Sequence, residues 1–168
     1  MGKIILINGQ GGAGKTSVSK ELLKELKNSA YFDVDFLVAT NPWEFGDATD
    51  NLAIKNAISL INNFFEKGFE NIIVSGLTRN QKLLDKFTEQ LNKGISILFI
   101  WLRANKETRL SRKEGRGRDD ADKKEHFNFL DKLMPDVESI EVKNGRSIFI
   151  EISSKTIQEI VSEIKKVI

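Results

Sequence analysis

The chain has 168 residues, of which 40% are hydrophobic and 30% are charged, and it contains no cysteine. This length can bury a core, so we expect a single domain over residues 1–168, and the lack of cysteine excludes disulfides and thiolate metal sites. The net charge of +2 argues against nucleic acid as a partner, and no apolar run approaches the roughly 18 residues of a membrane span. We therefore expect no membrane segment and a cytoplasmic location.

Apolar runs alternate with helical patterns along the chain, which is typical of βαβ units in a mostly parallel sheet. The apolar runs predict strands at Lys3–Asn8, Ala30–Asp33, Asn71–Ser75, Ile95–Leu102 and Ser147–Ile152. The helical patterns predict helices at Lys15–Lys27, Asn51–Lys67, Thr78–Lys93, Lys106–Glu114, Asp120–Met134 and Ser154–Ile168. Most of the strands are apolar throughout, as expected when helices cover both faces of a sheet. The sequence therefore predicts a three-layer α/β fold with a five-stranded parallel sheet flanked by helices.

Short signals mark the ends of several predicted helices. Thr78 and Gln81 have the spacing of a capping box, and Asn105 is placed to cap the helix that begins at Lys106. Gly68 and Gly94 stand where two helices are expected to end, because glycine accepts the left-handed conformation found there.

The first predicted strand leads into a glycine-rich loop that fits the pattern G-x-x-x-x-G-K-[ST] completely, from Gly9 to Thr16. Glycines let consecutive backbone N–H groups surround a phosphate, and the positive end of the following helix points to the same place. Lys15 adds a full positive charge for the β- and γ-phosphates, and the Thr16 hydroxyl is placed for Mg²⁺. The predicted nucleotide-binding residues of this loop are Gly9, Gly11, Gly12, Ala13, Gly14, Lys15, Thr16 and Ser17. The loop predicts a bound nucleoside triphosphate with magnesium.

Two absences favour a phosphotransferase over other proteins with such a loop. No Asn-Lys-x-Asp sequence follows a late strand, so the guanine-reading element of GTPases is missing. A mechanical ATPase would place an acidic residue at the end of a buried strand, whereas the strand "NIIVS" ends in Ser75 and Gly76.

The second predicted strand runs into Asp33-Val34-Asp35. In an extended segment, residues two apart share one side, so we expect both carboxylates to face the same way. One of the two carboxylates is predicted to join the Thr16 hydroxyl in coordinating magnesium. The other is predicted to accept a proton from an acceptor hydroxyl or to orient it.

A basic stretch follows the fourth predicted strand. Between Arg103 and Arg118 there are seven lysines and arginines against two glutamates. Arginines around two glycines suit a lid over a triphosphate, and we place this lid at about residues 112–122 with Arg116 or Arg118 as its acting arginine. A solvated helix end accounts for the lysines and for Arg109.

With these elements in this order, the chain resembles the small P-loop kinases of the nucleoside-monophosphate-kinase-like group. Within that group it is similar to shikimate and gluconate kinases and to chloramphenicol-phosphotransferase-like proteins. The resemblance implies phosphate binding by the glycine loop, a magnesium-side Asp33 and a substrate-side Asp35. It also implies that Arg112, which follows the run "WLRANKE", packs on adenine. Lys15, Asp35, Arg116 and Arg118 are the expected catalytic residues, Thr16 and Asp33 are the expected metal ligands, and ATP and Mg²⁺ are the expected cofactors.

The chain departs from shikimate kinases on the acceptor side, which we place at about residues 36–68. The triple glycine of that family is replaced by Ser75-Gly76-Leu77-Thr78-Arg79, and no arginine stands between Asp35 and Asn71. These departures argue against shikimate, with Arg79 as a candidate substitute anion contact. Three hypotheses stay open: phosphate transfer to a small molecule, favouring a hydroxyl acceptor; a nucleoside monophosphate kinase; and a non-catalytic ATP-binding regulator.

Overall fold

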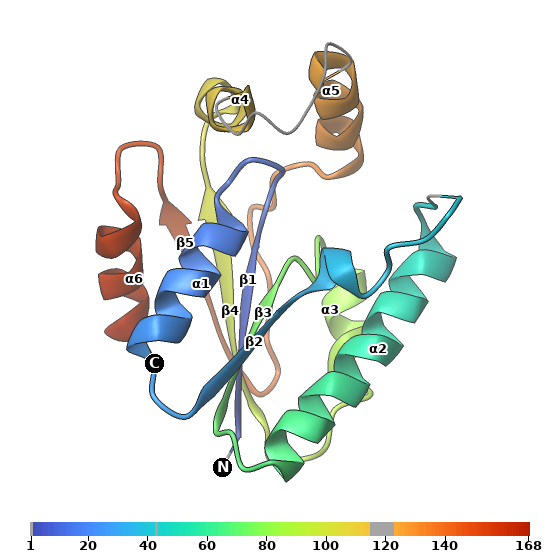
Figure 1. The fold of residues 1–168 in the computed structure, drawn as a ribbon, viewed down its shortest axis with the longest axis vertical. Coiled ribbons are helices and arrows are strands. Elements are labelled where there is room, and N and C mark those ends of the chain that lie inside the picture. Colours follow the sequence, from blue (N-terminus) through green and yellow to red (C-terminus); the bar gives the residue numbers. More distant parts are fainter. Residues whose placement is uncertain (1, 43, 115–122) are drawn as a thin grey trace.

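The structure is a computed structural model that describes residues 2–42, 44–114 and 123–168. Five parallel strands form one sheet in the order β2-β3-β1-β4-β5 (Figure 1). The strands are β1 (Lys3–Gly9), β2 (Ser29–Asp33), β3 (Asn71–Ser75), β4 (Ser96–Arg103) and β5 (Gly145–Glu151). The helices are α1 (Lys15–Glu25), the 3₁₀ helix η1 (Val34–Phe36), α2 (Asp47–Glu66), α3 (Gln81–Thr88), α4 (Lys106–Glu114), α5 (Lys123–Leu133) and α6 (Ile157–Lys165). The predicted five-stranded parallel sheet is confirmed.

Helices cover both faces of the sheet, because side chains alternate between the faces along each strand. On one face, Ile4 and Leu6 of β1 pack in a core that includes Ile54 of α2 and Phe87 of α3. On the other face, strand residues that include Ile5 pack against α1 and α6. All of these side chains are buried, which explains why the strands are apolar throughout.

Several helix ends differ from the prediction, among them the start of α2, which lies four residues earlier at Asp47. α3 begins at Gln81 because Asn80 caps it, with its Oδ1 accepting from the Leu83 N–H at 3.0 Å, so the capping box at Thr78 was wrong. The true capping box lies at Thr156, which starts α6 three residues later than expected. Gly94 follows α3 by several residues and precedes β4, so it does not end a helix.

Two other predicted helix ends are confirmed. The Asn105 Oδ1 accepts from the Thr108 N–H at 2.8 Å and so caps α4. Gly68 follows α2 with a φ of +98°, a conformation that glycine takes readily.

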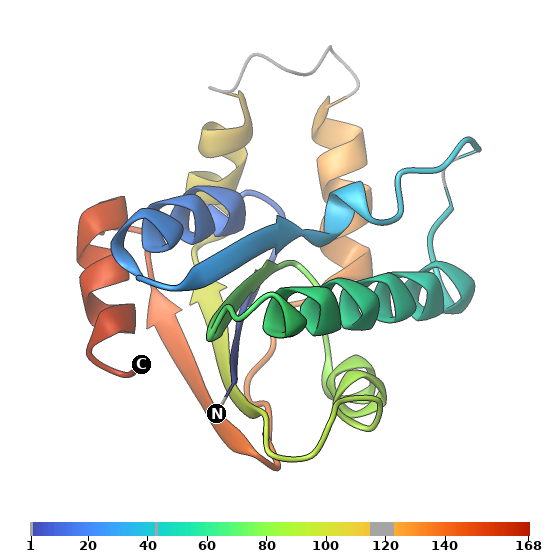
Figure 2. The same cartoon turned by 60° about the horizontal axis from the view of Figure 1, so that its bottom comes forward.

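α4 and α5 lie beyond the carboxyl ends of the strands, apart from the helices that cover the sheet (Figures 1 and 2). The loop after β1 and the 3₁₀ helix after β2 open at this same edge. Ligands of open α/β sheets bind at this edge, so the fold brings the predicted site segments together there. Within the described ranges, no helix has both the length and the apolar character needed to cross a membrane.

Candidate active site

The glycine loop between β1 and α1 is held tightly against the end of β4 and against α4. Gly12 has a φ of +84°, and a Cβ placed on it would lie 2.5 Å from the Arg109 carbonyl oxygen. A Cβ on Gly9 would lie 2.5 Å from the Leu102 carbonyl oxygen, again with a positive φ. No other residue type fits these two positions, because a side chain would collide with backbone.

The start of α1 has the features of an anion site. Gly14 stands at the N-cap without a side-chain cap, and the first turn carries no acidic residue that would neutralise the positive helix end. The Lys15 ammonium group donates to the carbonyl oxygens of Gly9 at 2.9 Å and of Gln10 at 3.2 Å. The lysine charge therefore lies over the loop, where a phosphate would meet it.

Asp33 is fixed beside this loop by three hydrogen bonds. Its Oδ2 accepts from the Thr16 hydroxyl at 2.8 Å and from the Tyr31 hydroxyl at 3.2 Å, and its Oδ1 accepts from the Asp35 N–H at 3.2 Å. Burial, and then the charge of Asp33, raises the pKa of Tyr31, so the phenol stays protonated as a donor. The structure thus brings together Thr16 and Asp33, the two predicted metal ligands, whereas Tyr31 was missed by the sequence analysis.

Asp35 lies in a different environment from Asp33. The prediction that both aspartates share one side of an extended segment was wrong, because the chain turns into η1 directly after Asp33. Asp35 is exposed as a residue, but burial of its carboxyl group and then the charge of Asp33 raise its pKa. The charges of Lys15 and Lys113 act in the opposite direction.

Lys113 of α4 reaches the glycine loop, which the sequence analysis did not foresee. Its ammonium nitrogen would lie 3.7 Å from a Cβ placed on Gly11, and it stands 5.2 Å from the centre of the Phe127 ring. A lysine expected on a solvated helix end therefore adds a second positive charge to the region of Lys15 and Asp35.

Arg109 is buried, not solvated as the sequence analysis expected. It forms an ion pair with Asp131 of α5, at 2.5 Å from Nη1 to Oδ1, and its Nη1 also donates to the Gly11 carbonyl at 3.2 Å. The Gln10 side chain donates to Asp131 at 3.3 Å and to the Met134 carbonyl at 3.0 Å. These bonds join the glycine loop, α4 and α5, the two helices on either side of the predicted lid.

A pocket of about 310 Å³ opens beside the start of α1. Ala13, Gly14 and Ser17 line one side, Arg112 is part of the lining, and the β5–α6 region contributes Ile152, Lys155, Thr156, Ile157 and Ile160. The Arg112 guanidinium donates to the Ile152 carbonyl at 3.1 Å, which fixes it at the pocket wall. The structure thus brings Arg112 to the glycine loop, and the β5–α6 wall is a part of the site without a recognisable motif.

The contacts described above do not include three of the predicted site residues. Arg116 and Arg118 lie outside the described residues. Arg79, the candidate anion contact, is paired with Asp50 through two hydrogen bonds of 2.5 and 2.6 Å.

The residues at the loop fit a triphosphate with magnesium. Among the described residues, no three His, Cys, Asp or Glu side chains gather into a group that could hold a metal by themselves. Magnesium does not require such a group, since it commonly binds one or two carboxylates together with substrate phosphates and water. The hydroxyl of Thr16 and the carboxylate of Asp33 are hard oxygen donors of the kind it takes.

Comparisons with known proteins agree with this geometry. Residues 5–134 match the profile of the AAA domain. The chain belongs to the AAA domain family. Its resemblance to small P-loop kinases is confirmed by the match of its fold to solved kinase structures. A search among curated proteins finds no match.

Three solved structures illustrate the likeness of this AAA domain protein. A gluconokinase from Sinorhizobium meliloti 1021 is 17% identical, with 96% of this chain and 88% of that chain covered and a TM-score of 0.70. A sugar kinase from Janibacter sp. HTCC2649 is 14% identical, with 99% and 94% covered and a TM-score of 0.72. A shikimate kinase from Acinetobacter baumannii, in complex with shikimate, is 19% identical, with 99% and 92% covered and a TM-score of 0.56. At these identities the comparison shows the fold, which is that of small P-loop kinases.

Proposed function

We propose that the protein is an ATP- and Mg²⁺-dependent phosphotransferase that moves the γ-phosphate to a hydroxyl group of a small molecule. The observation that carries this proposal is the different setting of the two aspartates. Asp33 is buried and bonded to Thr16 of the phosphate loop, whereas Asp35 is exposed and lies within the influence of the Lys15 charge. A protein that only binds ATP would need Asp33, whereas phosphate transfer also needs a group, such as Asp35, that faces the acceptor.

On the donor side, the loop amides and Lys15 bind the β- and γ-phosphates, and Lys113 adds a further charge from α4. The adenine base occupies the pocket beside α1, where Arg112 packs on it and the β5–α6 region forms the opposite wall. Arg116 or Arg118 closes over the phosphates from a lid at about residues 112–122. Because phosphoryl transfer depends mainly on positioning and charge, these residues suffice for the donor half of the reaction.

Thr16 and Asp33 are the residues that would hold magnesium. The metal neutralises charge on the β- and γ-phosphates when it is bound. Tyr31 keeps Asp33 in place by donating to the same carboxylate oxygen that Thr16 contacts. The hydrogen bond of Tyr31 thus supports the orientation of a metal ligand.

On the acceptor side, Asp35 accepts the proton of the acceptor hydroxyl. The acceptor oxygen bonds to the γ-phosphorus, the bond from that phosphorus to the bridging oxygen breaks, and ADP leaves. Its raised pKa makes Asp35 a better proton acceptor than an ordinary aspartate. Segment 36–68, within a single domain of residues 1–168, shapes the acceptor site.

The test is ATP consumption by the purified chain over a panel of sugars, sugar acids, nucleosides and nucleoside monophosphates, with Asp35→Asn beside the wild type. We expect at least one acceptor to raise consumption above background and Asp35→Asn to remove that increase while ATP affinity is unchanged. Glu89→Gln, an exposed carboxylate at the C-terminal end of α3 and outside segment 36–68, is the matched control and retains the activity.

The same experiment separates the other two hypotheses. Consumption raised by nucleoside monophosphates alone would identify a nucleotide kinase. No increase with any acceptor, with tight ATP binding, would identify a regulator and contradict the proposed reaction.

A further inference from the structure

The segment that directly follows Asp35 is acidic. Between Phe36 and Ile54 there are three carboxylates, Glu44, Asp47 and Asp50, and no lysine, arginine or histidine. Carboxylate and phosphate groups of ligands are held by cationic donors, above all by the planar fork of arginine. The segment therefore contributes negative charge to the acceptor side and no cationic side chain that could hold an anionic acceptor.

Arg79 reaches this segment from the β3–α3 loop, but its guanidinium group is already occupied. Both of its terminal nitrogens donate to the Asp50 carboxylate, at 2.5 and 2.6 Å, in a bidentate pair. The guanidinium carbon also lies 4.7 Å from the centre of the Phe45 ring. An anionic ligand would have to displace Asp50, so this arginine stabilises the start of α2 and does not offer a binding site for an acid.

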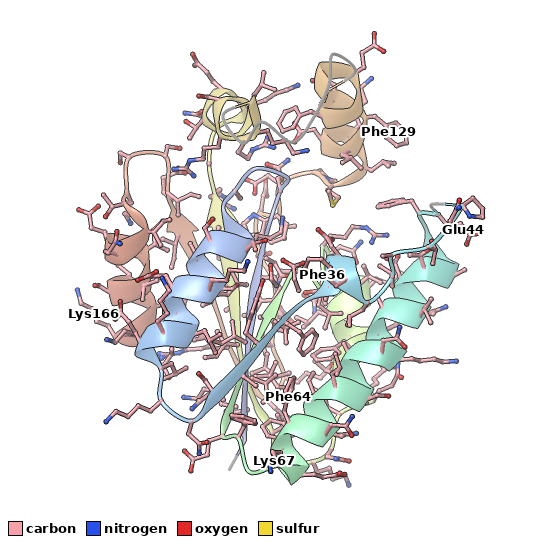
Figure 3. The ribbon with its side chains drawn as sticks, viewed as in Figure 1. Phe36, Glu44, Phe64, Lys67, Phe129 and Lys166 are labelled. Atoms are coloured by element: carbon pink, nitrogen blue, oxygen red, sulfur yellow. The ribbon has the colours of Figure 1, made fainter. Side chains whose placement is uncertain are left out.

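Two exposed phenylalanine side chains belong to the same segment. Phe36 is 82% exposed and is the next residue after Asp35, and Phe45 is 39% exposed above Arg79. Figure 3 shows Phe36 on η1 and Phe129 on α5, the helix that rises beyond the carboxyl edge of the sheet. An acceptor whose hydroxyl meets the Asp35 carboxylate has the rest of its structure within reach of the Phe36 ring. Exposed aromatic rings beside a reactive group are typical of ligand contacts.

We infer that the acceptor is a hydroxyl compound that carries no anionic group and turns an apolar or aromatic face to Phe36. This inference rests on the proposed function and names the substrate class. It excludes sugar acids and nucleoside monophosphates as acceptors. It admits uncharged and positively charged alcohols, since the carboxylates of the segment attract a cation and phenylalanine rings accept one.

The first experiment uses pairs of alcohols that differ in an anionic group. Adenosine is compared with adenosine monophosphate, glucose with gluconate, and 4-(hydroxymethyl)benzamide with 4-(hydroxymethyl)benzoate. Binding is measured by calorimetry on the full chain with Mg²⁺ and a non-hydrolysable ATP analogue, and turnover is measured with ATP. In each pair, we expect the member without the anionic group to bind about tenfold more tightly. We also expect the alcohols that carry an aromatic ring system to bind more tightly than glucose.

The second experiment releases Arg79. Asp50→Asn removes the charge that occupies the guanidinium group, and we expect about tenfold tighter binding of the benzoate with little change for the benzamide. The control is Asp47→Asn, in the same first turn of α2. Asp47 lies 3.6 Å from the exposed Lys82. Releasing this exposed lysine leaves the affinity for the benzoate unchanged, because an exposed, solvent-screened charge adds little to binding.

Each outcome decides the inference. Equal or tighter binding of the anionic members, binding of neither member in any pair, or an Asp50→Asn variant that gains no affinity for the benzoate would overturn it. A concentration-dependent dimer that is lost in Phe36→Ala would also overturn it, because Phe36 would then contact a second copy of the chain. Turnover of anionic alcohols alone would leave the proposed function in place. Binding of the uncharged alcohols without any phosphorylation would remove the proposed function and retain the inference.

Discussion

The two sides of the site are built differently. On the donor side, Arg109 and Asp131 bury an ion pair that also bonds the glycine loop, and Gly9 and Gly12 leave no room for a side chain. On the acceptor side, Asp35 and Phe36 are exposed on a single 3₁₀ turn. Backbone amides and fixed charges suit the triphosphate of the proposed reaction. An exposed turn with loop side chains suits an acceptor that differs between proteins of the same fold.

Because the donor side depends on fixed charges, we expect the largest effect on turnover from a substitution of Lys15. Lys15→Ala removes the full charge that lies over the loop carbonyls, and we expect turnover to fall by about a thousandfold with weakened ATP binding. The measurement is steady-state turnover together with ATP titration. Lys20→Ala, an exposed lysine on the same helix, is the control and retains both. Retained turnover in Lys15→Ala would show that the donor side does not depend on this charge.

The second prediction concerns how much the buried ion pair of Arg109 and Asp131 stabilises the protein. Asp131→Ala leaves the buried Arg109 guanidinium, whose side chain is 4% exposed, without its carboxylate. We expect the free energy of unfolding to fall by about 3 kcal/mol, as measured by urea denaturation. Glu21→Ala breaks the exposed pair with Lys24 and should cost less than about 1 kcal/mol. An equal fall in the free energy of unfolding for the two variants would mean that the buried Arg109–Asp131 pair stabilises the protein no more than an exposed ion pair does.

The smallest expected effect is on stability, and it concerns the capping box of α6 on the β5–α6 side of the pocket beside α1. Thr156 accepts from the Glu159 N–H at 3.2 Å and completes the capping box of α6. Thr156→Ala should lower the free energy of unfolding by about 1 kcal/mol, whereas Thr156→Ser keeps the hydroxyl and most of the stability. Thermal denaturation of both variants measures the difference. If Thr156→Ser were as unstable as Thr156→Ala, the hydroxyl would not be the stabilising group.

The sequence predicted the sheet and the phosphate loop because both depend on local patterns. Apolar runs mark buried parallel strands, and the glycines with Lys15 and Thr16 form a contiguous motif. The start of α3 was misplaced because Thr78 and Asn80 both have side chains that can cap a helix. The structure decides between them with the bond from Asn80 to Leu83.

The parts of the site that escaped prediction depend on contacts between distant residues. Arg109 and Asp131 stand 22 residues apart, so nothing in the local pattern separates a buried arginine from a solvated one. Lys113 was assigned to a solvated helix end for the same reason, although it reaches Gly11. The aspartates of the second strand were recognised, but their separate environments follow from the turn at η1, which the alternation of side chains does not reveal.

The most direct test follows the γ-phosphate itself. With ATP labelled at the γ-position, Mg²⁺ and an acceptor that raises ATP consumption, phosphorus NMR distinguishes a phosphate ester from inorganic phosphate. We expect the label to appear as an ester on the acceptor hydroxyl with the wild type, and no ester to form with Asp35→Asn although this variant still binds ATP. Release of the label as inorganic phosphate alone, or equal ester formation by Asp35→Asn, would contradict the account.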